Sequence, residues 1–108
     1  MSDGSRTVIA GARRWVVKIG SALLTDDGRG IDAGVISALV AEVAILRSSG
    51  CEVVLVSSGA VAAGLLRLGW PARPDSLHEL QAAAAVGQSA LLQRYEQELA
   101  ARGLLSAQ

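Results

Sequence analysis

The chain has 108 residues, of which 51% are hydrophobic, and its ten basic residues balance ten acidic ones. A chain of this length forms one domain at most, and it can bury about two-thirds of the surface that it would expose when unfolded. Zero net charge gives no broad positive field for nucleic acid or an anionic membrane, so any anion site has to be local. The single cysteine, Cys51, excludes an internal disulfide and is typical of a reducing compartment.

The sequence predicts neither a membrane-spanning segment nor a secretory leader. The apolar runs are too short to span a membrane, because Lys18, Glu42, Arg47 and Arg67 interrupt them. The first residues lack the basic region, apolar core and cleavage site of a secretory leader. We therefore expect a cytoplasmic protein that has neither a membrane nor a nucleic acid as its partner.

The first half of the chain alternates between predicted strands and a helix. An edge strand is expected at residues 7–10 and a buried strand at 15–19, followed by a loop of turn-forming residues. Asp32 is suited to cap a helix, and apolar residues then recur at helical spacing up to Ser48. A β-branched run at 51–58 predicts the next strand. This order favours two parallel strands joined by a crossover helix, hence an α/β fold with a mainly parallel sheet in one domain, residues 1–108.

Two more helices are expected in the second half. A short helix of small residues is predicted within residues 59–69, ending at a glycine. Ser76 and Glu79 have the S-x-x-E spacing of a capping box, which starts a long helix that runs to Arg102 with Gly87 as a candidate bend. The next glycine stops that helix. The last five residues have the composition of an opening strand.

Both predicted strands end in glycine and small polar residues. Lys18, Gly20 and Ser21 lie at the end of the first strand, and Ser58 and Gly59 follow the second. Ligands of open α/β sheets bind beyond the carboxyl ends of the strands, so the two turns are expected to lie side by side. Glycine lets backbone N–H groups approach a ligand, and the helix after Gly59 directs free donors to the same point. Lys18 would stabilise the negative charge of a transferring phosphoryl group there.

Structural interpretations of these residues stay open at this level. Lys18 could be an edge-strand lysine that keeps its ammonium group in solvent. Ser58 and Gly59 could form only a tight turn and a helix cap. Gly64, with alanines around it, favours close helix packing over a ligand site, and Asp26 and Asp27 favour turn chemistry over a metal site.

Two better-known nucleotide motifs are not supported. Residues 59–66 have the glycine frame of a Walker A loop, but Leu65 and Leu66 stand where the mechanism needs Lys and Ser or Thr. Residues 28–33 match G-x-G-x-x-A, yet several residues separate them from the first strand. A dinucleotide-binding domain would also need an acidic residue after the second strand, where serines stand instead.

Four stretches follow one another between about Arg13 and the last residue: RRWVVKIGSALLT, VVLVSSGAVAAG, LGWP and LHELQAAAAVGQSALLQRYEQ. In the order and spacing of these stretches, the chain resembles the amino-terminal part of the glutamate 5-kinases (gamma-glutamyl kinases) of the amino acid kinase family. This resemblance implies a three-layer α/β/α amino acid kinase-like fold, truncated to its amino-terminal part. It also implies ATP-dependent phosphorylation of the side-chain carboxylate of L-glutamate with Mg²⁺, the first step of proline biosynthesis, and a homo-oligomer for the full-length family.

The resemblance also implies roles for individual residues. Lys18 matches the phosphate-contacting, catalytic lysine of the family, with Gly20 and Ser21 in the glycine loop that binds the phosphates of ATP. Ser58–Ala60 match the segment that binds glutamate. Ala22 stands where family members often have a second Ser or Thr, so the hydroxyl set of this loop differs from theirs.

The resemblance implies that this chain holds only the front half of the active site. Family enzymes continue with an Asn/Asp-rich loop, a catalytic aspartate, a second lysine and the nucleotide-binding half. We therefore expect the 108 residues to be a fragment that does not catalyse alone. The alternative is a non-catalytic interaction module that associates with a full-length kinase. In either case, a parallel sheet of two strands leaves an unpaired edge and uncovered apolar surface, which predicts self-association.

Overall fold

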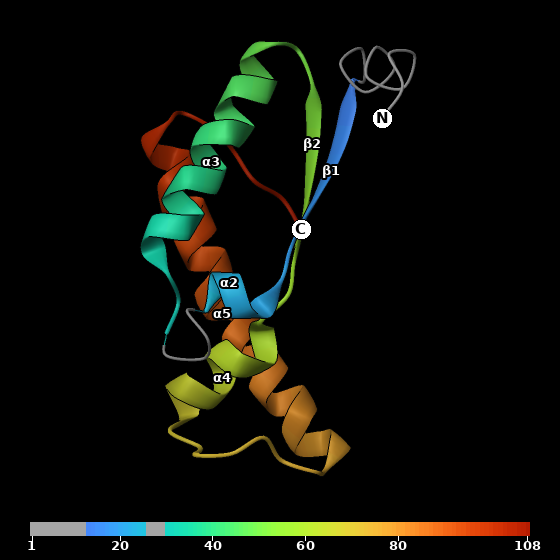
Figure 1. Cartoon of the computed structure of the whole chain (residues 1–108), viewed down its shortest axis with the longest axis vertical. Helices are drawn as coiled ribbons and strands as arrows, with labels where there is room; N and C mark the ends of the chain where they lie inside the picture. Colours follow the sequence, from blue (N-terminus) through green and yellow to red (C-terminus); the bar gives the residue numbers. More distant parts are fainter. Residues whose placement is uncertain (1–12, 26–29) are drawn as a thin grey trace.

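The computed structural model describes residues 13–25 and 30–108 (Figure 1). Two strands and four helices follow one another in the described chain: β1 (Arg14–Ile19), α2 (Ser21–Leu24), α3 (Ala33–Ser48), β2 (Glu52–Ser57), α4 (Ala60–Leu68) and α5 (Leu77–Ala101). The predicted α/β class is confirmed. The edge strand expected at residues 7–10 lies outside the described residues.

The two strands pair in parallel, and Arg14 lies opposite Glu52 at the start of the register. Helix α3 is the crossover between them, as the sequence predicts. Its cap is Asp32, whose carboxylate accepts a hydrogen bond from the N–H of Val35 at 3.1 Å. This bond satisfies one of the N–H groups that the first turn of a helix leaves unpaired.

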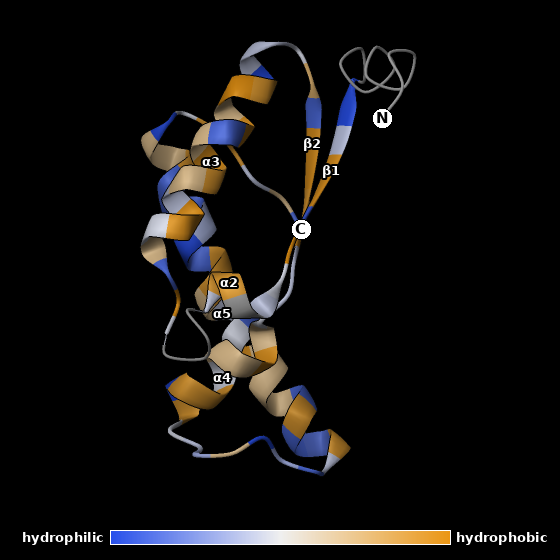
Figure 2. Ribbon diagram, viewed as in Figure 1, coloured by the Kyte–Doolittle hydropathy of each residue, from blue (hydrophilic) through white to orange (hydrophobic). Residues whose placement is uncertain are grey.

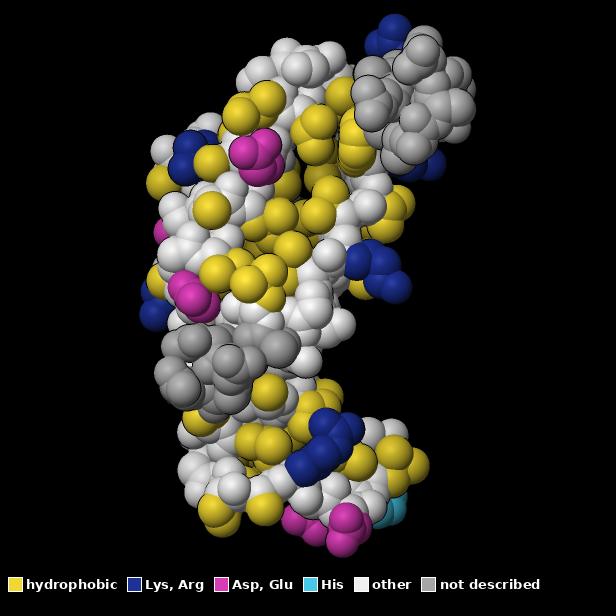
Figure 3. Space-filling model, in the orientation of Figure 1, with side chains coloured by type: hydrophobic (Ala, Val, Ile, Leu, Met, Phe, Trp, Pro, Cys, Tyr) yellow, Lys and Arg dark blue, Asp and Glu magenta, His cyan; other side chains and the backbone are white. Residues whose placement is uncertain are grey.

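Helices cover one face of the sheet. Side chains of both strands alternate between half-buried and exposed, and α3 and α5 lie on the same side of the strands (Figure 1). Hydrophobic side chains gather between α3 and the strands (Figure 3). The buried core consists of Leu24, Ile36, Val40, Val43, Ala63, Leu91, Tyr95 and Leu99.

The other face of the sheet has no described element over it. The strands are hydrophobic along most of their length (Figure 2), and this face carries Val16, Val54 and Val56, which are 60%, 45% and 42% exposed. Exposed apolar residues on neighbouring strands form a patch instead of scattered single residues. The described residues thus make two layers, a sheet and the helices on one side of it.

Helices α4 and α5 approach each other at two glycines. A Cβ atom on Gly64 would lie 1.7 Å from the carbonyl oxygen of Ala83, and one on Gly87 would lie 1.6 Å from that of Ala60. No side chain fits at either position. The packing role predicted for Gly64 is confirmed, and Gly87 has the same role within an α5 that continues through it to Ala101.

Two local features differ from the sequence-based prediction. A four-residue helix, α2, forms directly after β1, where a loop was expected. The opening strand expected at residues 104–108 is wrong for this structure, because the described sheet holds only β1 and β2 and neither pairs with this segment. The tail begins instead with Gly103 in a left-handed conformation (φ 72°), and the N–H of Leu104 donates to the carbonyl of Leu99 at 2.8 Å. This cap ends α5 at the predicted glycine.

Candidate functional site

The carboxyl ends of β1 and β2 lead into two turns that touch each other. The N–H of Ser58 donates to the carbonyl of Ile19 at 3.0 Å, so the pairing continues one residue beyond β2. A Cβ on Gly59 would lie 3.4 Å from the Cα of Ser21, which is van der Waals distance. The turn at 20–21 and the turn at 58–59 therefore lie side by side, as the order of the elements predicts.

Gly59 is held in a conformation that other residues rarely adopt. Its φ is +93°, in the left-handed region, and an added Cβ would lie 3.2 Å from Cγ2 of Thr25. Thr25 is only 1% exposed, and its hydroxyl donates to the carbonyl of Ser21 at 2.6 Å. The hydroxyl of this threonine thus stabilises the turn after β1, and its methyl group packs beside the turn after β2. Sequence reasoning missed Thr25; its signal is a β-branched hydroxyl four residues after Ser21, within reach of that carbonyl.

A second missed residue, Tyr95, anchors the end of β2. Its hydroxyl lies 3.1 Å from the Oγ of Ser57 and forms a hydrogen bond with it, and the tyrosine is 6% exposed. Ser57 is the last residue of β2 and directly precedes Ser58. The bond therefore connects the C-terminal half of α5 to the strand end that carries the candidate site.

A hollow of about 310 Å³ opens at this edge of the sheet. Its lining comes from both turns, from the first turn of α4 and from the segment after α4, and consists of Ser21, Ser57, Ser58, Gly59, Ala60, Val61, Ala62 and Arg73. No side chain caps α4 at Gly59. The N–H groups of the first helical turn are therefore available to a ligand in the hollow, and the helix dipole favours an anion there.

Lys18 does not line the hollow. It is an exposed residue of β1, opposite Val56, and strand alternation places it on the uncovered face together with Val16. It forms no ion pair or hydrogen bond with any residue that the structure describes. The structure thus brings Gly20, Ser21, Ser58, Gly59 and Ala60 together at one edge, with Lys18 two residues before Gly20.

The described part of the chain offers no obvious metal-binding cluster. Among residues 13–25 and 30–108, no three His, Cys, Asp or Glu residues lie close enough together to hold a metal ion. We therefore assign no magnesium ligand to them. Within the same ranges, no helix is long and apolar enough to cross a membrane.

The sequence of this chain matches a known family. Residues 13–108 match the model of the amino acid kinase family. The chain belongs to that family. It is 64% identical over 106 residues to the glutamate 5-kinase of Chromohalobacter salexigens, and 60% identical over 103 residues to that of Ralstonia nicotianae. A third glutamate 5-kinase, from Ectopseudomonas mendocina, is 59% identical over 103 residues.

These alignments cover 95% to 98% of this family member but 28% of the length of each relative. The resemblance to the amino-terminal portion of glutamate 5-kinases is therefore confirmed. The chain spans a little over a quarter of the curated kinases that it matches.

Proposed function

We propose that this chain forms the front part of the active site of a glutamate 5-kinase, which transfers a phosphoryl group from ATP to the side-chain carboxylate of L-glutamate. The observation that carries the proposal is the contact between the two turns, where an added Cβ on Gly59 would meet Ser21. The homologous glutamate 5-kinases support it. The product, glutamyl 5-phosphate, would enter proline biosynthesis in the cytoplasm.

The reaction requires an anion to attack another anion, so positioning and charge stabilisation carry most of the catalysis. A carboxylate oxygen of glutamate attacks the γ-phosphorus of ATP, and the bond from that phosphorus to the bridging oxygen of ADP breaks. We assign the carboxylate to the hydroxyl of Ser58 and to the N–H groups at Gly59 and Ala60. All three residues line the hollow at the positive end of α4. The magnesium ion that the family uses would neutralise phosphate charge when bound.

We assign the transferring phosphoryl group to the turn after β1. Gly20 is exposed, and apart from its chain neighbours no described residue has a heavy atom within 4 Å of a Cβ built on it, so a phosphate oxygen has room to approach its backbone. Ser21 lines the hollow from this side. Lys18 has a flexible four-carbon stem and no partner among the described residues, so its ammonium group is free to extend toward the same rim as a point charge.

The proposal also includes a third layer. An α/β/α sandwich needs helices on both faces of its sheet, and the face with Val16, Val54 and Val56 has none in the described chain. In the full-length proteins, which we expect to be homo-oligomers, the further part of the chain would supply that layer and the nucleotide-binding half.

A two-component assay tests the proposal. The chain is assayed for glutamate-dependent release of ADP, alone and mixed with a polypeptide that corresponds to the unmatched remainder of the Chromohalobacter salexigens kinase. We expect no turnover from the chain alone, turnover in the mixture, and a loss of at least a hundredfold with Lys18→Ala. Arg14→Ala, on the same strand and face, is the matched control and should retain activity.

Two results would contradict the proposal. One is a mixture that associates but leaves ATP turnover independent of glutamate. The other is a Lys18→Ala mixture that is as active as the unaltered one. Turnover by the chain alone that Lys18→Ala abolishes would instead refute the expectation that the fragment is inactive, while supporting the role of the lysine.

The second candidate function is a non-catalytic interaction module. The apolar uncovered face favours it, and so does the edge of β2, which pairs with no other strand of the described residues, since such edges pair readily with other strands. It predicts that the chain binds a full-length glutamate 5-kinase without adding any activity. The same assay, with the full-length kinase as the partner, separates this function from the first.

A further inference from the structure

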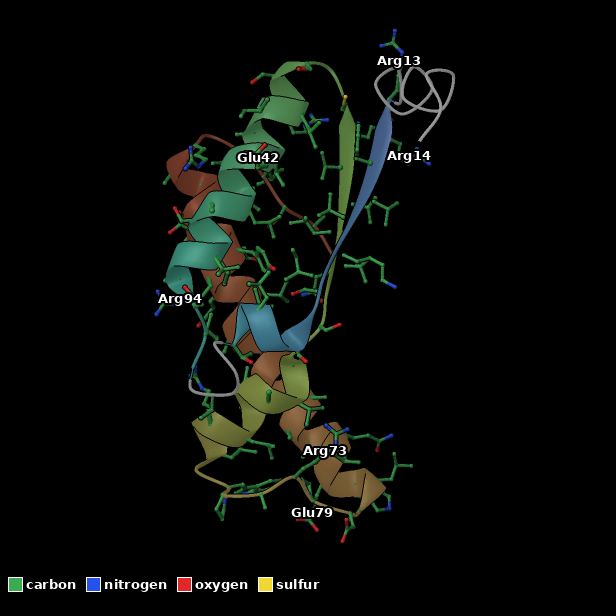
Figure 4. The ribbon with its side chains drawn as sticks, viewed as in Figure 1. Arg13, Arg14, Glu42, Arg73, Glu79 and Arg94 are labelled. Carbon is green, nitrogen blue, oxygen red and sulfur yellow. The ribbon has the colours of Figure 1, made fainter. Side chains whose placement is uncertain are left out.

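Among the residues that the structure describes, one charged side chain lines the hollow at the end of the sheet; it is exposed, and neither strand supplies it. Arg73 lines the hollow together with Ser21, Ser58 and the first turn of α4, although it belongs to the segment between α4 and α5. In Figure 4 it lies beside α4, whereas Arg13 and Arg14 lie at the opposite end of the molecule. A basic residue distant in sequence from both turns thus reaches the same site.

The guanidinium group of Arg73 has no acidic partner among the described residues. It makes no ion pair or hydrogen bond with any residue in the described ranges, and no Asp or Glu of those ranges lines the hollow. The uncapped amino terminus of α4 adds partial positive charge to the same space. A concave site of about 310 Å³ with these two positive features suits a small molecule that carries negative charge.

The backbone around Arg73 is restrained. Helix α4 ends at Gly69 in a left-handed conformation (φ 72°), and the N–H of Trp70 donates to the carbonyl of Leu65 at 2.9 Å, which turns the chain back toward α4. Pro71 and Pro74 then flank Ala72 and Arg73 and limit their backbone freedom. Less backbone entropy is therefore lost when this segment binds a ligand.

From this geometry we propose that Arg73 binds the α-carboxylate of L-glutamate, the end of the substrate that does not react. The inference rests on the proposed function, which places the side-chain carboxylate on Ser58, Gly59 and Ala60, facing the turn at 20–21 where the phosphoryl group arrives. The opposite end of the substrate then faces the segment after α4. A guanidinium group binds a carboxylate through two parallel N–H donors, which fixes the orientation of the molecule as well as its charge.

Ligand binding to the 108-residue chain tests the inference without any need for turnover. The probes are L-glutamate and 4-aminobutyrate, which keeps one carboxylate and the amine but lacks the α-carboxylate. Shifts of the backbone amide signals of Ser58 and Gly59 in ¹⁵N-labelled protein report binding at the site. We expect glutamate to bind at least about tenfold more tightly than 4-aminobutyrate, because only glutamate gains the charge-assisted pair with Arg73.

Substitutions assign that preference to one side chain. Arg73→Gln should weaken glutamate binding at least about tenfold and bring the two probes to nearly equal affinity, whereas Arg73→Lys should give an intermediate preference. Arg67→Gln, an equal change of charge on the exposed last turn of α4, is the matched control and should stay within about twofold of the unaltered chain. Dispersed amide spectra of each variant show that it is folded.

Each other outcome has a defined meaning. If Arg73→Gln keeps the preference for glutamate, the inference is overturned and the proposed substrate stands. If glutamate leaves both amides unchanged while inorganic phosphate shifts them in an Arg73-dependent way, Arg73 is an anion ligand but the proposed substrate is wrong. If neither anion shifts the amides of the folded chain, both the inference and the assignment of glutamate to this hollow are overturned.

Discussion

The α4–α5 pair and the two-stranded sheet differ in how their surfaces are covered: the two helices pack against each other, whereas one face of the sheet stays exposed. The backbones of the two helices are in contact at Gly64 and Gly87, so each helix finds its packing partner within this chain. The sheet is covered on one face and leaves Val16 and Val54 exposed on the other. A helix pair needs only two neighbouring segments, whereas a parallel sheet needs layers on both faces. The candidate site lies where these two regions meet, because Gly59 joins the end of β2 to the start of α4.

The largest effect is expected from filling the space between the helices. Gly87→Ala places a methyl group 1.6 Å from the carbonyl oxygen of Ala60, so α4 and α5 must separate. We expect a loss of about 3 kcal/mol in the free energy of unfolding, at the upper end for overpacking, because the obstacle is backbone and not a side chain that can rotate. Chemical denaturation measures it. Ser89→Ala, exposed and two residues along α5, is the control, and an equal effect of both substitutions would contradict the packing argument.

The next effect concerns the uncovered face of the sheet. We expect the chain to self-associate through this face, and Val54→Lys to weaken the association at least about tenfold by placing a charge in the contact. Sedimentation velocity over a range of concentrations measures it. Ile45→Lys, at an exposed position on α3, is the control and should leave association unchanged. An unaltered chain that stays monomeric at every concentration would rule out this use of the face.

The smallest effect comes from the bond that joins the two regions. Tyr95→Phe and Ser57→Ala each remove one partner of the hydrogen bond between α5 and the end of β2. In a double-mutant cycle followed by denaturation, we expect a coupling free energy of about 1 kcal/mol, the usual net value for such a bond. Additive effects of the two substitutions would show that the contact stabilises neither region.

Local signals predicted most of the secondary structure. Asp32 and Ser76 cap the helices for which they were proposed, because each cap needs only a side-chain oxygen and an N–H group three residues away. Helix α2 escaped prediction, since four residues are too few for a periodic pattern. The predicted strand at 104–108 did not form, because a strand depends on a neighbouring strand and not on its own composition.

Part of the candidate site was predictable and part was not. Ser21 and Gly59 could be brought together from topology alone, because parallel strands end at one edge of a sheet. Thr25 and Tyr95, which support the two turns, were missed, because their partners depend on how α2 and α5 settle against the strands. Arg73 was missed as well, since its place in the hollow depends on how the chain turns after α4.

The order of residues by itself determined the parallel pair, the helix caps and the likeness to glutamate 5-kinases. These follow from short-range hydrogen bonding, from the period of apolar residues and from the spacing of motifs. Only the tertiary structure decided which side chains share the hollow and which face of the sheet is covered. It also showed that Gly87 allows α5 to pack closely against α4. Those outcomes depend on the distance between segments far apart in the chain, and that distance is set by packing, which no local pattern records.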